Sequence, residues 1–540
     1  MDKKKCILVT SALPYANGPI HLGHLVEYIQ TDIWVRLNKF LCHDVTYICA
    51  DDAHGTPIML KAKEDGISPE ELINKSLAEH KKDFEDFLIK FDHYSSTHSE
   101  TNEKSCIEIF QRLTDEKYIY KKSIDQYFDE KVNIFLPDRY IKGTCPKCGA
   151  KDQYGDSCEK CGATYNSTEI INPISSISGS KPIIKSTEHF FFELKKFEKF
   201  LSEWLENTDI QPSIKNKLNE WLSSGIQDWD ITRDSPYFGF KIPGENNKYF
   251  YVWMDAPIGY IASLNEYKNI NSEVKAINYW NEDIEIYHFI GKDIAYFHCL
   301  FWPAILRGID YNLPTNIFCH GFLTINGMKM SKSRNTFIRA SDFVKKFDPE
   351  FLRYYFASKL SNTIEDIDLN FEDFRKKINS DLIGKVINLL SRSVSFIKNN
   401  DYKLAINLSD ENHYQNFVSR TENILKELHL RKYSSATKEI MKLADEANTF
   451  FNDNAPWKLD KDKDKKLIQE ISTQAINYYK IIITLLSPIL PNLFDESCKI
   501  LNIKKLNIKN YKDPTLDHEI NKFSPLKNRI DQEDVKEFVN

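Results

Sequence analysis

The sequence predicts an α/β protein in which an insertion splits a parallel sheet and an α-helical bundle follows. Three observations support this fold class. Short apolar runs alternate with a helical pattern at the start of the chain, similar runs return near residue 290, and apolar side chains beyond residue 375 recur at helical spacing. Strands that alternate with helices are typical of parallel sheets.

The first strand is expected at Ile7–Val9, where an apolar run follows a lysine-rich start. A turn-rich stretch at 14–19 leads into a helical pattern from His21 to about Phe40, and Thr46–Ala50 forms a second strand-like run. Strand, helix and strand at this spacing predict a βαβ unit, and therefore a Rossmann-like parallel sheet.

The second half of the sheet is expected at Tyr287–Ile290 and Ile317–His320, so an insertion of roughly 110 residues separates the two halves. In the C-terminal half, apolar positions fall on one helical face in two separate stretches. These positions are Phe417, Thr421, Ile424, Leu425 and Leu428, and then Leu467, Ile471, Ala475, Tyr478, Ile482 and Leu485.

Composition places the chain among soluble proteins of several domains. It has 540 residues, 41% hydrophobic and 28% charged, and roughly 150 residues per domain predicts about three or four domains. The net charge of -6 gives no global basic signature for nucleic acid, although local Lys/Arg patches can bind it. No segment predicts a membrane span or secretory signal, and the scattered cysteines favour a reducing cytoplasm.

Two histidines stand where the first strand is followed by the first helix, in Pro19-Ile-His21-Leu-Gly23-His24. Backbone N–H groups and the positive dipole end at a helix N-terminus favour a polyphosphate, and both rings share one helical face. Gly23 leaves room for a flat base to approach the backbone. For this motif alone, an ordinary helix start with satisfied histidines is the alternative.

A basic loop lies far downstream, in Gly327-Met-Lys329-Met-Ser-Lys332-Ser-Arg334. A solvated surface loop is the ordinary interpretation of such a charge run. The functional interpretation is a clamp on a leaving pyrophosphate, because the charge of that group grows in the transition state.

Together the two motifs resemble the HIGH and KMSKS signatures of class I aminoacyl-tRNA synthetases, in the order typical of that family. The resemblance implies that His21, Gly23, His24 and Lys332 bind ATP, which carries Mg²⁺, and that His21, His24, Lys329 and Lys332 stabilise charge during catalysis. It implies no side-chain nucleophile. The amino-acid carboxylate attacks the α-phosphorus of ATP, and the terminal ribose hydroxyl of tRNA then attacks the adenylate.

Four stretches, 11–18, 47–57, 251–260 and 291–298, resemble the methionine-specific branch of this family, which charges initiator and elongator tRNA(Met) with L-methionine. An aromatic-rich pocket suits the polarizable thioether of methionine, although single aromatics more often fill cores. The residues expected to line the pocket are Leu13, Tyr15, Trp253, Ala256, Pro257, Tyr260, Ile294 and His298. By resemblance, Asp52 takes the substrate ammonium and Arg233 lies near the carboxylate or phosphates.

The insertion contains Cys145-Pro-Lys-Cys148 and Cys158-Glu-Lys-Cys161. Each C-x-x-C turn brings two thiolates to one ion, and four sulfurs complete a tetrahedral zinc site with no open position. The sequence therefore predicts one structural zinc. An iron–sulfur cluster or a redox pair is the alternative.

The helical half resembles the anticodon-binding domain of the family, in which Asn388, Arg392 and Trp457 read the CAU anticodon. Bases stack on aromatic and guanidinium planes, although bundle packing of Trp457 and a solvated Arg392 are the ordinary interpretation.

The predicted segments are the first half of the catalytic domain at 1–115, the insertion with its zinc knuckle at 116–230, the second half at 231–325, the region of the basic loop and of contact with the tRNA stem at 326–375, and the anticodon-binding domain at 376–540. Longer family members carry an extra dimerising domain, so a monomer is expected.

Three other functions are compatible with parts of the sequence. A nucleotidyltransferase could use the histidine motif without tRNA, and a zinc-containing nucleic-acid-binding protein would lack catalysis. Pyrophosphate exchange that depends on methionine separates both from the favoured function. A cysteine-specific class I synthetase is expected to place zinc in its amino-acid site, whereas four thiolates leave no room there for substrate.

Overall fold

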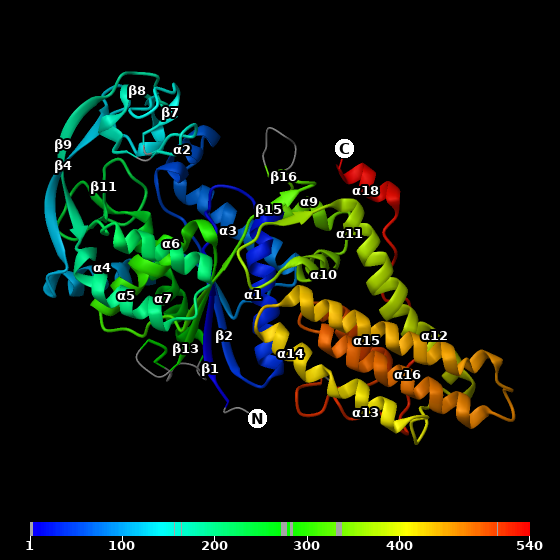
Figure 1. The fold of residues 1–540 in the computed structure, drawn as a ribbon. Helices are drawn as coiled ribbons and strands as arrows, with labels where there is room; N and C mark the ends of the chain where they lie inside the picture. Colours follow the sequence, from blue (N-terminus) through cyan, green and yellow to red (C-terminus); the bar gives the residue numbers. More distant parts are fainter. Residues whose placement is uncertain are drawn as a thin grey trace.

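The computed structural model describes residues 4–155, 157–163, 165–271, 278–280, 284–330, 337–504 and 506–539. Figure 1 shows a central sheet, an elongated insertion on one side of it and a helical bundle on the other. The insertion ends in a small knuckle around β7 and β8, and the bundle of α12 to α16 extends in the opposite direction.

The central sheet has five parallel strands in the order β14-β13-β1-β2-β3. They are β1 (Cys6–Ser11), β2 (Asp44–Asp51), β3 (His93–Ser96), β13 (Glu285–Gly291) and β14 (Asn316–His320). The predicted βαβ unit is confirmed, because α1 (Leu22–Phe40) connects β1 to β2. From β1 the chain continues to β2 on one side and later returns to β13 on the other, which places a ligand crevice at the carboxyl end of β1.

Helices cover the sheet and connect its halves. They are α2 (Thr56–Asp65), α3 (Pro69–Asp86), α4 (Glu100–Asp115), α7 (Val252–Ile270) and α8 (Trp302–Gly308). Helix α7 packs against β2, β3 and α4, and its residues from Met254 to Leu264 are buried. This burial fixes the first turn of α7 beside the crevice.

The insertion is built on a long antiparallel ribbon of β4 (Ile119–Asp129) and β9 (Ile183–Phe192). Strands β5 (Ile134–Phe135) and β10 (Trp229–Asp230) complete this sheet in the order β10-β9-β4-β5. At the tip, β6 (Ile141–Thr144), β7 (Gln153–Tyr154) and β8 (Ile171–Ser175) form the knuckle, while α5 (Glu198–Asn207) and α6 (Pro212–Ser223) lie nearer the central sheet. The ribbon therefore carries the four cysteines away from the sheet (Figure 1).

Short elements border the crevice. The hairpin of β11 (Thr232–Asp234) and β12 (Lys248–Phe250) follows the insertion. After the central sheet come β15 (Leu323–Ile325), β16 (Met328–Lys329), α9 (Ala340–Val344), α10 (Pro349–Lys359) and β17 (Ile367–Leu369). Strands β16, β15 and β17 form a small sheet beside the end of β14.

The C-terminal half is helical, as predicted. Its helices are α11 (Phe371–Lys377), α12 (Asn388–Ile397), α13 (Glu411–Ser419), α14 (Thr421–His429), α15 (Tyr433–Asn454), α16 (Lys465–Leu486), α17 (Pro491–Leu501) and α18 (Gln532–Val539). Most of the predicted apolar face of α16 is buried, but Leu467 in its first turn is 42% exposed. No helix within the described ranges combines the length and apolarity that a membrane span requires.

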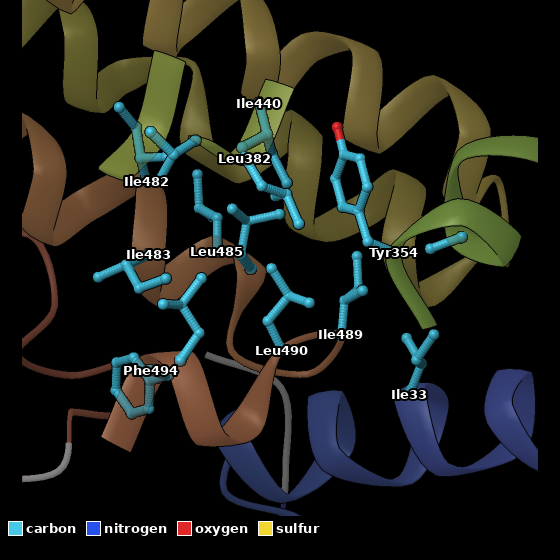
Figure 2. Packing of buried hydrophobic residues seen from close by; sticks show 14 of the residues in the cluster. Ile33, Tyr354, Leu382, Ile440, Ile482, Ile483, Leu485, Ile489, Leu490 and Phe494 are labelled. Atoms are coloured by element: carbon cyan, nitrogen blue, oxygen red, sulfur yellow. The ribbon is translucent and has the colours of Figure 1, made fainter. Parts of the chain in front are cut away.

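The bundle and the central sheet share one hydrophobic core. Figure 2 shows Ile33 of α1 and Tyr354 of α10 beside the buried side chains of the bundle. Arg353 is fully buried between these parts, where it donates to Asp32 of α1 at 2.6 Å and to the carbonyl of Ile489 at 2.8 Å. A buried guanidinium that loses such partners costs several kcal/mol, so these contacts hold α1, α10 and the turn after α16 together.

Candidate active site

A cavity of about 1450 Å³ opens at the carboxyl ends of the parallel strands. Residues just beyond β1, β2 and β13 line it, namely Ala12, Asp52 and Asp293, together with His320 at the end of β14. Four residues of the insertion also line the cavity, namely Gln126, Asp138, Arg139 and Tyr140. Ligand pockets typically measure about 300–1,000 Å³, so this cavity has room for more than one small substrate.

The two histidines of the first motif form the N-terminal cap of α1. His21 is the N-cap, and its Nδ1 accepts hydrogen bonds from the backbone N–H groups of Gly23 at 3.1 Å and His24 at 3.3 Å. The Nδ1 of His24 accepts in turn from the backbone N–H of His21 at 3.3 Å, and the two rings stack at 3.6 Å. Since both Nδ1 atoms accept, each neutral ring carries its proton on Nε2 and can donate it to a ligand.

Burial also determines the charge of His24. Burial lowers the pKa of His24 well below its ordinary value, and the neighbouring His21 and His80 lower that pKa further. His24 is therefore a neutral hydrogen-bond donor at physiological pH and not a cation.

The basic loop and the residues after it border the same cavity. Lys329 and Met330 of the basic loop line the cavity, as does Phe337 after it. Phe337 contacts the His21 ring edge-on at 5.0 Å, and the Leu22 N–H donates to the carbonyl of Ile338 at 3.0 Å. Lys332 itself lies outside the described residues. The residues that follow the basic loop are thus held at the N-terminus of α1.

Asp52 places a carboxylate in the wall of the cavity. Its backbone is held by Tyr15 and its neighbours, since the Asp52 N–H donates to the carbonyl of Pro14 at 2.8 Å. Its Oδ1 is buried and accepts no hydrogen bond from the described residues. Burial, and then the nearby Asp255, raise the pKa of Asp52 well above its ordinary value. A buried carboxylate whose negative charge is disfavoured in this way favours a ligand group that carries a positive charge.

The residues predicted to bind methionine fall into two sets. Leu13, Tyr15, Trp253 and Ile294 line the cavity. Ala256, Pro257, Tyr260 and His298 are buried and do not belong to its lining. The Trp253 ring stacks on Phe297 at 3.9 Å.

Tyr260 and His298 form a neutral buried pair. The Nδ1–H of His298 donates to the carbonyl of Ile294 at 3.2 Å, so its Nε2 accepts from the Tyr260 hydroxyl at 2.8 Å. Burial lowers the pKa of His298 to about 4. The pair therefore brings no charge into this apolar region.

Arg233 lies on β11 at the side of the cavity. Its guanidinium carbon lies 3.6 Å from the centroid of the Tyr251 ring, a cation–π arrangement. Its Nη1 lies 3.7 Å from a carboxylate oxygen of Asp230. The cavity thus has a buried carboxylate just beyond β2 and a cation on β11.

Several cavity residues were missed by the sequence analysis. Aromatic rings of Trp229, Tyr251, Phe297 and Phe301 form much of one wall, and Trp229 contacts Phe301 at 4.1 Å. Asp293, just beyond β13, also lines the cavity. A carboxylate directly after a parallel strand is a signal that could have identified Asp293, because such ends border the ligand crevice.

The four predicted cysteines of the knuckle converge. Their sulfur atoms all lie within 4.8 Å of one another, with 3.9 Å between Cys145 and Cys161 and 3.6 Å between Cys148 and Cys158. All eleven cysteines lie within the described ranges, and none forms a disulfide. Zinc–sulfur bonds of about 2.3 Å in a tetrahedron place the sulfurs roughly 3.8 Å apart. The observed spacing fits a four-thiolate metal site.

A second group of predicted residues lies in the bundle. Trp457 is 45% exposed in the turn between α15 and α16, and the guanidinium carbon of Arg392 lies 5.2 Å from its ring centroid. Arg392 donates to the side chain of Asn452 at 2.9 Å, and Asn388 is exposed one turn earlier on α12. Figure 1 shows this turn at the end of the bundle that is remote from the sheet.

Comparisons with known proteins show the family to which the chain belongs. A family model described as tRNA synthetases class I (M) matches residues 7–394. The methionine–tRNA ligase of Psychrobacter sp. (strain PRwf-1) is 50% identical over 555 residues, which cover 99% of this chain and 79% of that protein.

Two solved structures of methionyl-tRNA synthetase from Mycobacterium tuberculosis, each with methionyl-adenylate, share the fold. Their TM-scores are 0.77 and 0.76 at 22% identity, and the matches cover 93% of this chain and 94% and 95% of those chains. The family match and the half-identical relative carry the assignment. The chain belongs to the class I methionyl-tRNA synthetases and is a methionine–tRNA ligase.

Proposed function

We propose that the cavity binds ATP and L-methionine side by side and that the residues described above activate the amino acid there. One observation carries this proposal: Phe337 and Ile338, which follow the basic loop, contact His21 and Leu22 at the N-terminus of α1, and Lys329 lines the same cavity as the stacked histidines. A polyphosphate placed there would face the positive dipole end of α1, the Nε2 donors of His21 and His24, and the loop cations together.

On the ATP side, the division of labour follows from charge. His21 and His24 donate hydrogen bonds through Nε2, while Lys329 and Lys332 supply the positive charge that the leaving pyrophosphate requires. Histidine and lysine side chains are poor Mg²⁺ ligands, so the phosphates themselves would hold the ion, which neutralises part of their charge. Asp293 is placed to accept from a ribose hydroxyl.

On the methionine side, Asp52 pairs with the ammonium group and Arg233 attracts the carboxylate or the α-phosphate. The aromatic wall with Tyr15 and Trp253 receives the thioether, because sulfur contacts ring edges favourably. The buried Tyr260 and His298 stand behind this wall as its polar support. Catalysis consists of positioning and charge stabilisation, and the carboxylate of methionine is the nucleophile.

Gly23→Ala tests the ATP side of the proposal. A methyl group on Gly23 would lie 2.9 Å from Cε1 and 3.0 Å from Nδ1 of His21, so the stacked ring must move. We expect kcat/KM for ATP in pyrophosphate exchange to fall about 10- to 100-fold, because a displacement of about 1 Å can cost 10²-fold.

Gly18→Ala is the matched control, since a methyl group there meets nothing within 4 Å. Its exchange rate should stay close to that of the wild type. Equal rates in the two variants, at equal melting temperatures, would contradict the placement of ATP at the histidines.

We further propose that the four cysteines hold one structural zinc ion. Gly149 and Gly162 adopt left-handed φ values of 72° and 71°, and their N–H groups donate to the carbonyls of Cys145 and Cys158, which closes each turn around its cysteine pair. The ion would cross-link the two turns at the tip of the ribbon, and four thiolates leave no position for a substrate.

Cys158→Ser is expected to remove this metal. Elemental analysis of the purified protein should give one zinc per wild-type chain and far less than one per variant chain, because a structural zinc site contributes directly to folding. Limited proteolysis should then cut the knuckle while the bundle stays intact. Cys42→Ser, outside the cluster, should retain full zinc content, and iron in place of zinc would contradict the proposed metal.

Finally, we propose that Asn388, Arg392 and Trp457 bind the anticodon of tRNA(Met). The exposed indole and the guanidinium beside it offer planes on which unpaired bases stack. The amino-acid cavity and the proposed anticodon site lie on separate parts of the molecule, so the bundle can select the tRNA while the cavity activates the amino acid.

A further inference from the structure

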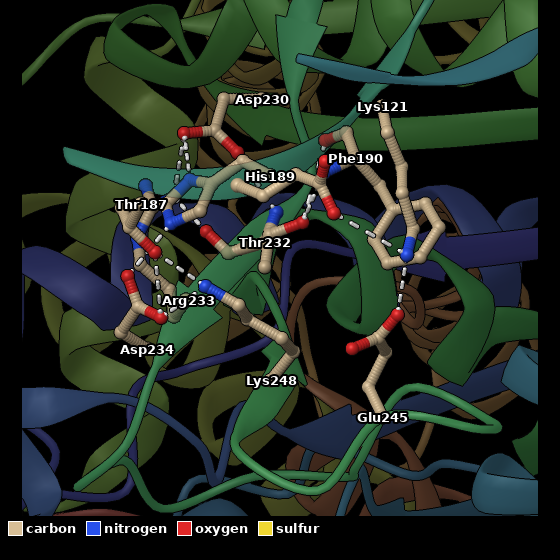
Figure 3. A network of polar contacts seen from close by, with 11 residues as sticks. Lys121, Thr187, His189, Phe190, Asp230, Thr232, Arg233, Asp234, Glu245 and Lys248 are labelled. Atoms are coloured by element: carbon tan, nitrogen blue, oxygen red, sulfur yellow. Dashed lines mark hydrogen bonds and ion pairs between the residues drawn. The ribbon is translucent and has the colours of Figure 1, made fainter. Parts of the chain in front are cut away.

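A buried histidine outside the cavity connects the charged groups around Arg233 (Figure 3). His189 on β9 is fully buried and does not line the cavity. Its Nδ1 lies 2.8 Å from a carboxylate oxygen of Asp230, and its Nε2 lies 2.9 Å from one of Asp234. These two aspartates flank Arg233 in the sequence and, unlike His189, they line the cavity.

The two hydrogen bonds identify the charge on His189. Carboxylates only accept, so both ring nitrogens must carry protons for both bonds to form. Burial alone would lower the pKa of His189, but hydrogen bonds and charges of Asp230 and Asp234 outweigh it and raise the pKa. The ring is therefore an imidazolium that bridges two strands.

The remaining neighbours occupy both carboxylates, and Arg233 makes only a long ion pair with Asp230. Lys248 on β12 pairs with Asp234, whose Oδ1 also accepts from Thr187 at 3.2 Å. The other oxygen of Asp230 accepts from the Thr232 N–H at 3.0 Å. Asp230 thus has two partners other than Arg233, which stays 3.7 Å away and stacks on Tyr251.

We propose that His189 is a positioning residue for methionine activation: it hydrogen-bonds to Asp230 and Asp234, so that neither carboxylate forms a close ion pair with Arg233. Without the imidazolium, the charge of Asp230 would have one fewer partner, and the nearest cation is the Arg233 guanidinium. A direct pair between them would turn the guanidinium from Tyr251 and neutralise the positive potential that an anionic substrate group meets. The inference rests on the proposed role of Arg233 in binding that anion.

The test is a set of coupled substitutions assayed by methionine-dependent pyrophosphate exchange. His189→Gln should lower kcat/KM about 10- to 100-fold, a loss of the size expected when a group near the reaction is displaced by about 1 Å. In an Arg233→Ala background the same change should cost no more than about 3-fold, because coupled residues are not additive.

Asp230→Asn provides a rescue. The amide oxygen can still accept from the Thr232 N–H, but the amide carries no charge to attract Arg233. His189→Gln with Asp230→Asn should therefore regain at least about 5-fold over His189→Gln alone, a recovery that a merely structural role would not produce. If the glutamine variant does not fold, His189→Asn with and without Asp230→Asn serves the same comparison.

His93→Gln is the matched control, because His93 also bonds a carboxylate, Glu266 at 3.1 Å, but Glu266, unlike Asp230 and Asp234, does not line the cavity. Its effect should be the same in the wild type and in the Arg233→Ala background. The inference is overturned if the losses caused by His189→Gln and Arg233→Ala multiply in the double variant, or if Asp230→Asn gives no rescue. Either result leaves the proposed role of Arg233 in place. A wild-type rate for Arg233→Ala would overturn the proposed role of Arg233, and this inference with it.

Discussion

Asp52→Asn is expected to lower kcat/KM for methionine roughly 10²- to 10³-fold. The Oδ1 of Asp52 is buried in the cavity wall without a partner among the described residues, so it is available to the substrate ammonium. Removing one member of a buried charge pair costs about 2–5 kcal/mol, and each 1.4 kcal/mol is tenfold. Steady-state pyrophosphate exchange measures the effect.

Two controls separate charge pairing from a general defect. A methionine analogue without the amino group should inhibit the wild type and Asp52→Asn equally, because it cannot use the carboxylate. Asp44→Asn removes an exposed carboxylate paired with Lys4 and should leave exchange unchanged. If the analogue loses as much affinity as methionine does, Asp52 supports the pocket and does not bind the ammonium.

The same carboxylate gives methionine binding a pH dependence. Burial and Asp255 raise the pKa of Asp52, so the free enzyme takes up this proton at a higher pH than an ordinary aspartate does. Since only the ionised form pairs with an ammonium group, the Kd for methionine should rise as the pH falls through the raised pKa. In Asp52→Asn this dependence should be absent.

Trp457→Ala is expected to lower tRNA charging about 5- to 100-fold while pyrophosphate exchange stays at the wild-type rate. The indole is 45% exposed beside Arg392, and stacking of one base is worth about 1–3 kcal/mol. Because the turn that carries it lies at the far end of the bundle, the amino-acid cavity should not sense the change (Figure 1). Aminoacylation and exchange, measured on the same preparation, test both statements.

Two substitutions sharpen this result. Trp457→Phe keeps an aromatic plane and should retain most of the charging activity. Leu467→Ala removes a side chain of similar exposure from the nearby start of α16 and should have no effect. Equal losses of charging and exchange in Trp457→Ala would argue for a folding defect in the bundle.

The sequence predicted those parts of the site whose local pattern determines their geometry. A histidine that caps its own helix and a glycine two residues later fix the start of α1, so the motif predicted both the helix and its place beside β1. The two C-x-x-C turns likewise predicted their convergence, because each turn closes through its own backbone.

Other features depend on contacts between distant segments, which no local pattern records. The burial of Tyr260 away from the cavity lining follows from how α7 packs on the sheet. The link between His189 and Asp234 requires β9, β10 and β11 to be placed side by side. The exposure of Leu467 could not be predicted either, because helical periodicity does not show where a neighbouring helix ends.

The core that joins α1 to the bundle combines residues that are far apart in the sequence. Ile33 and Arg353 complete their surroundings only with residues beyond 480, although the histidines that cap α1 belong to the first 30 residues. The nascent N-terminal half therefore cannot bury this face of α1 until the residues beyond 480 have been synthesised. Formation of the helix that borders the cavity is tied in this way to synthesis of the bundle.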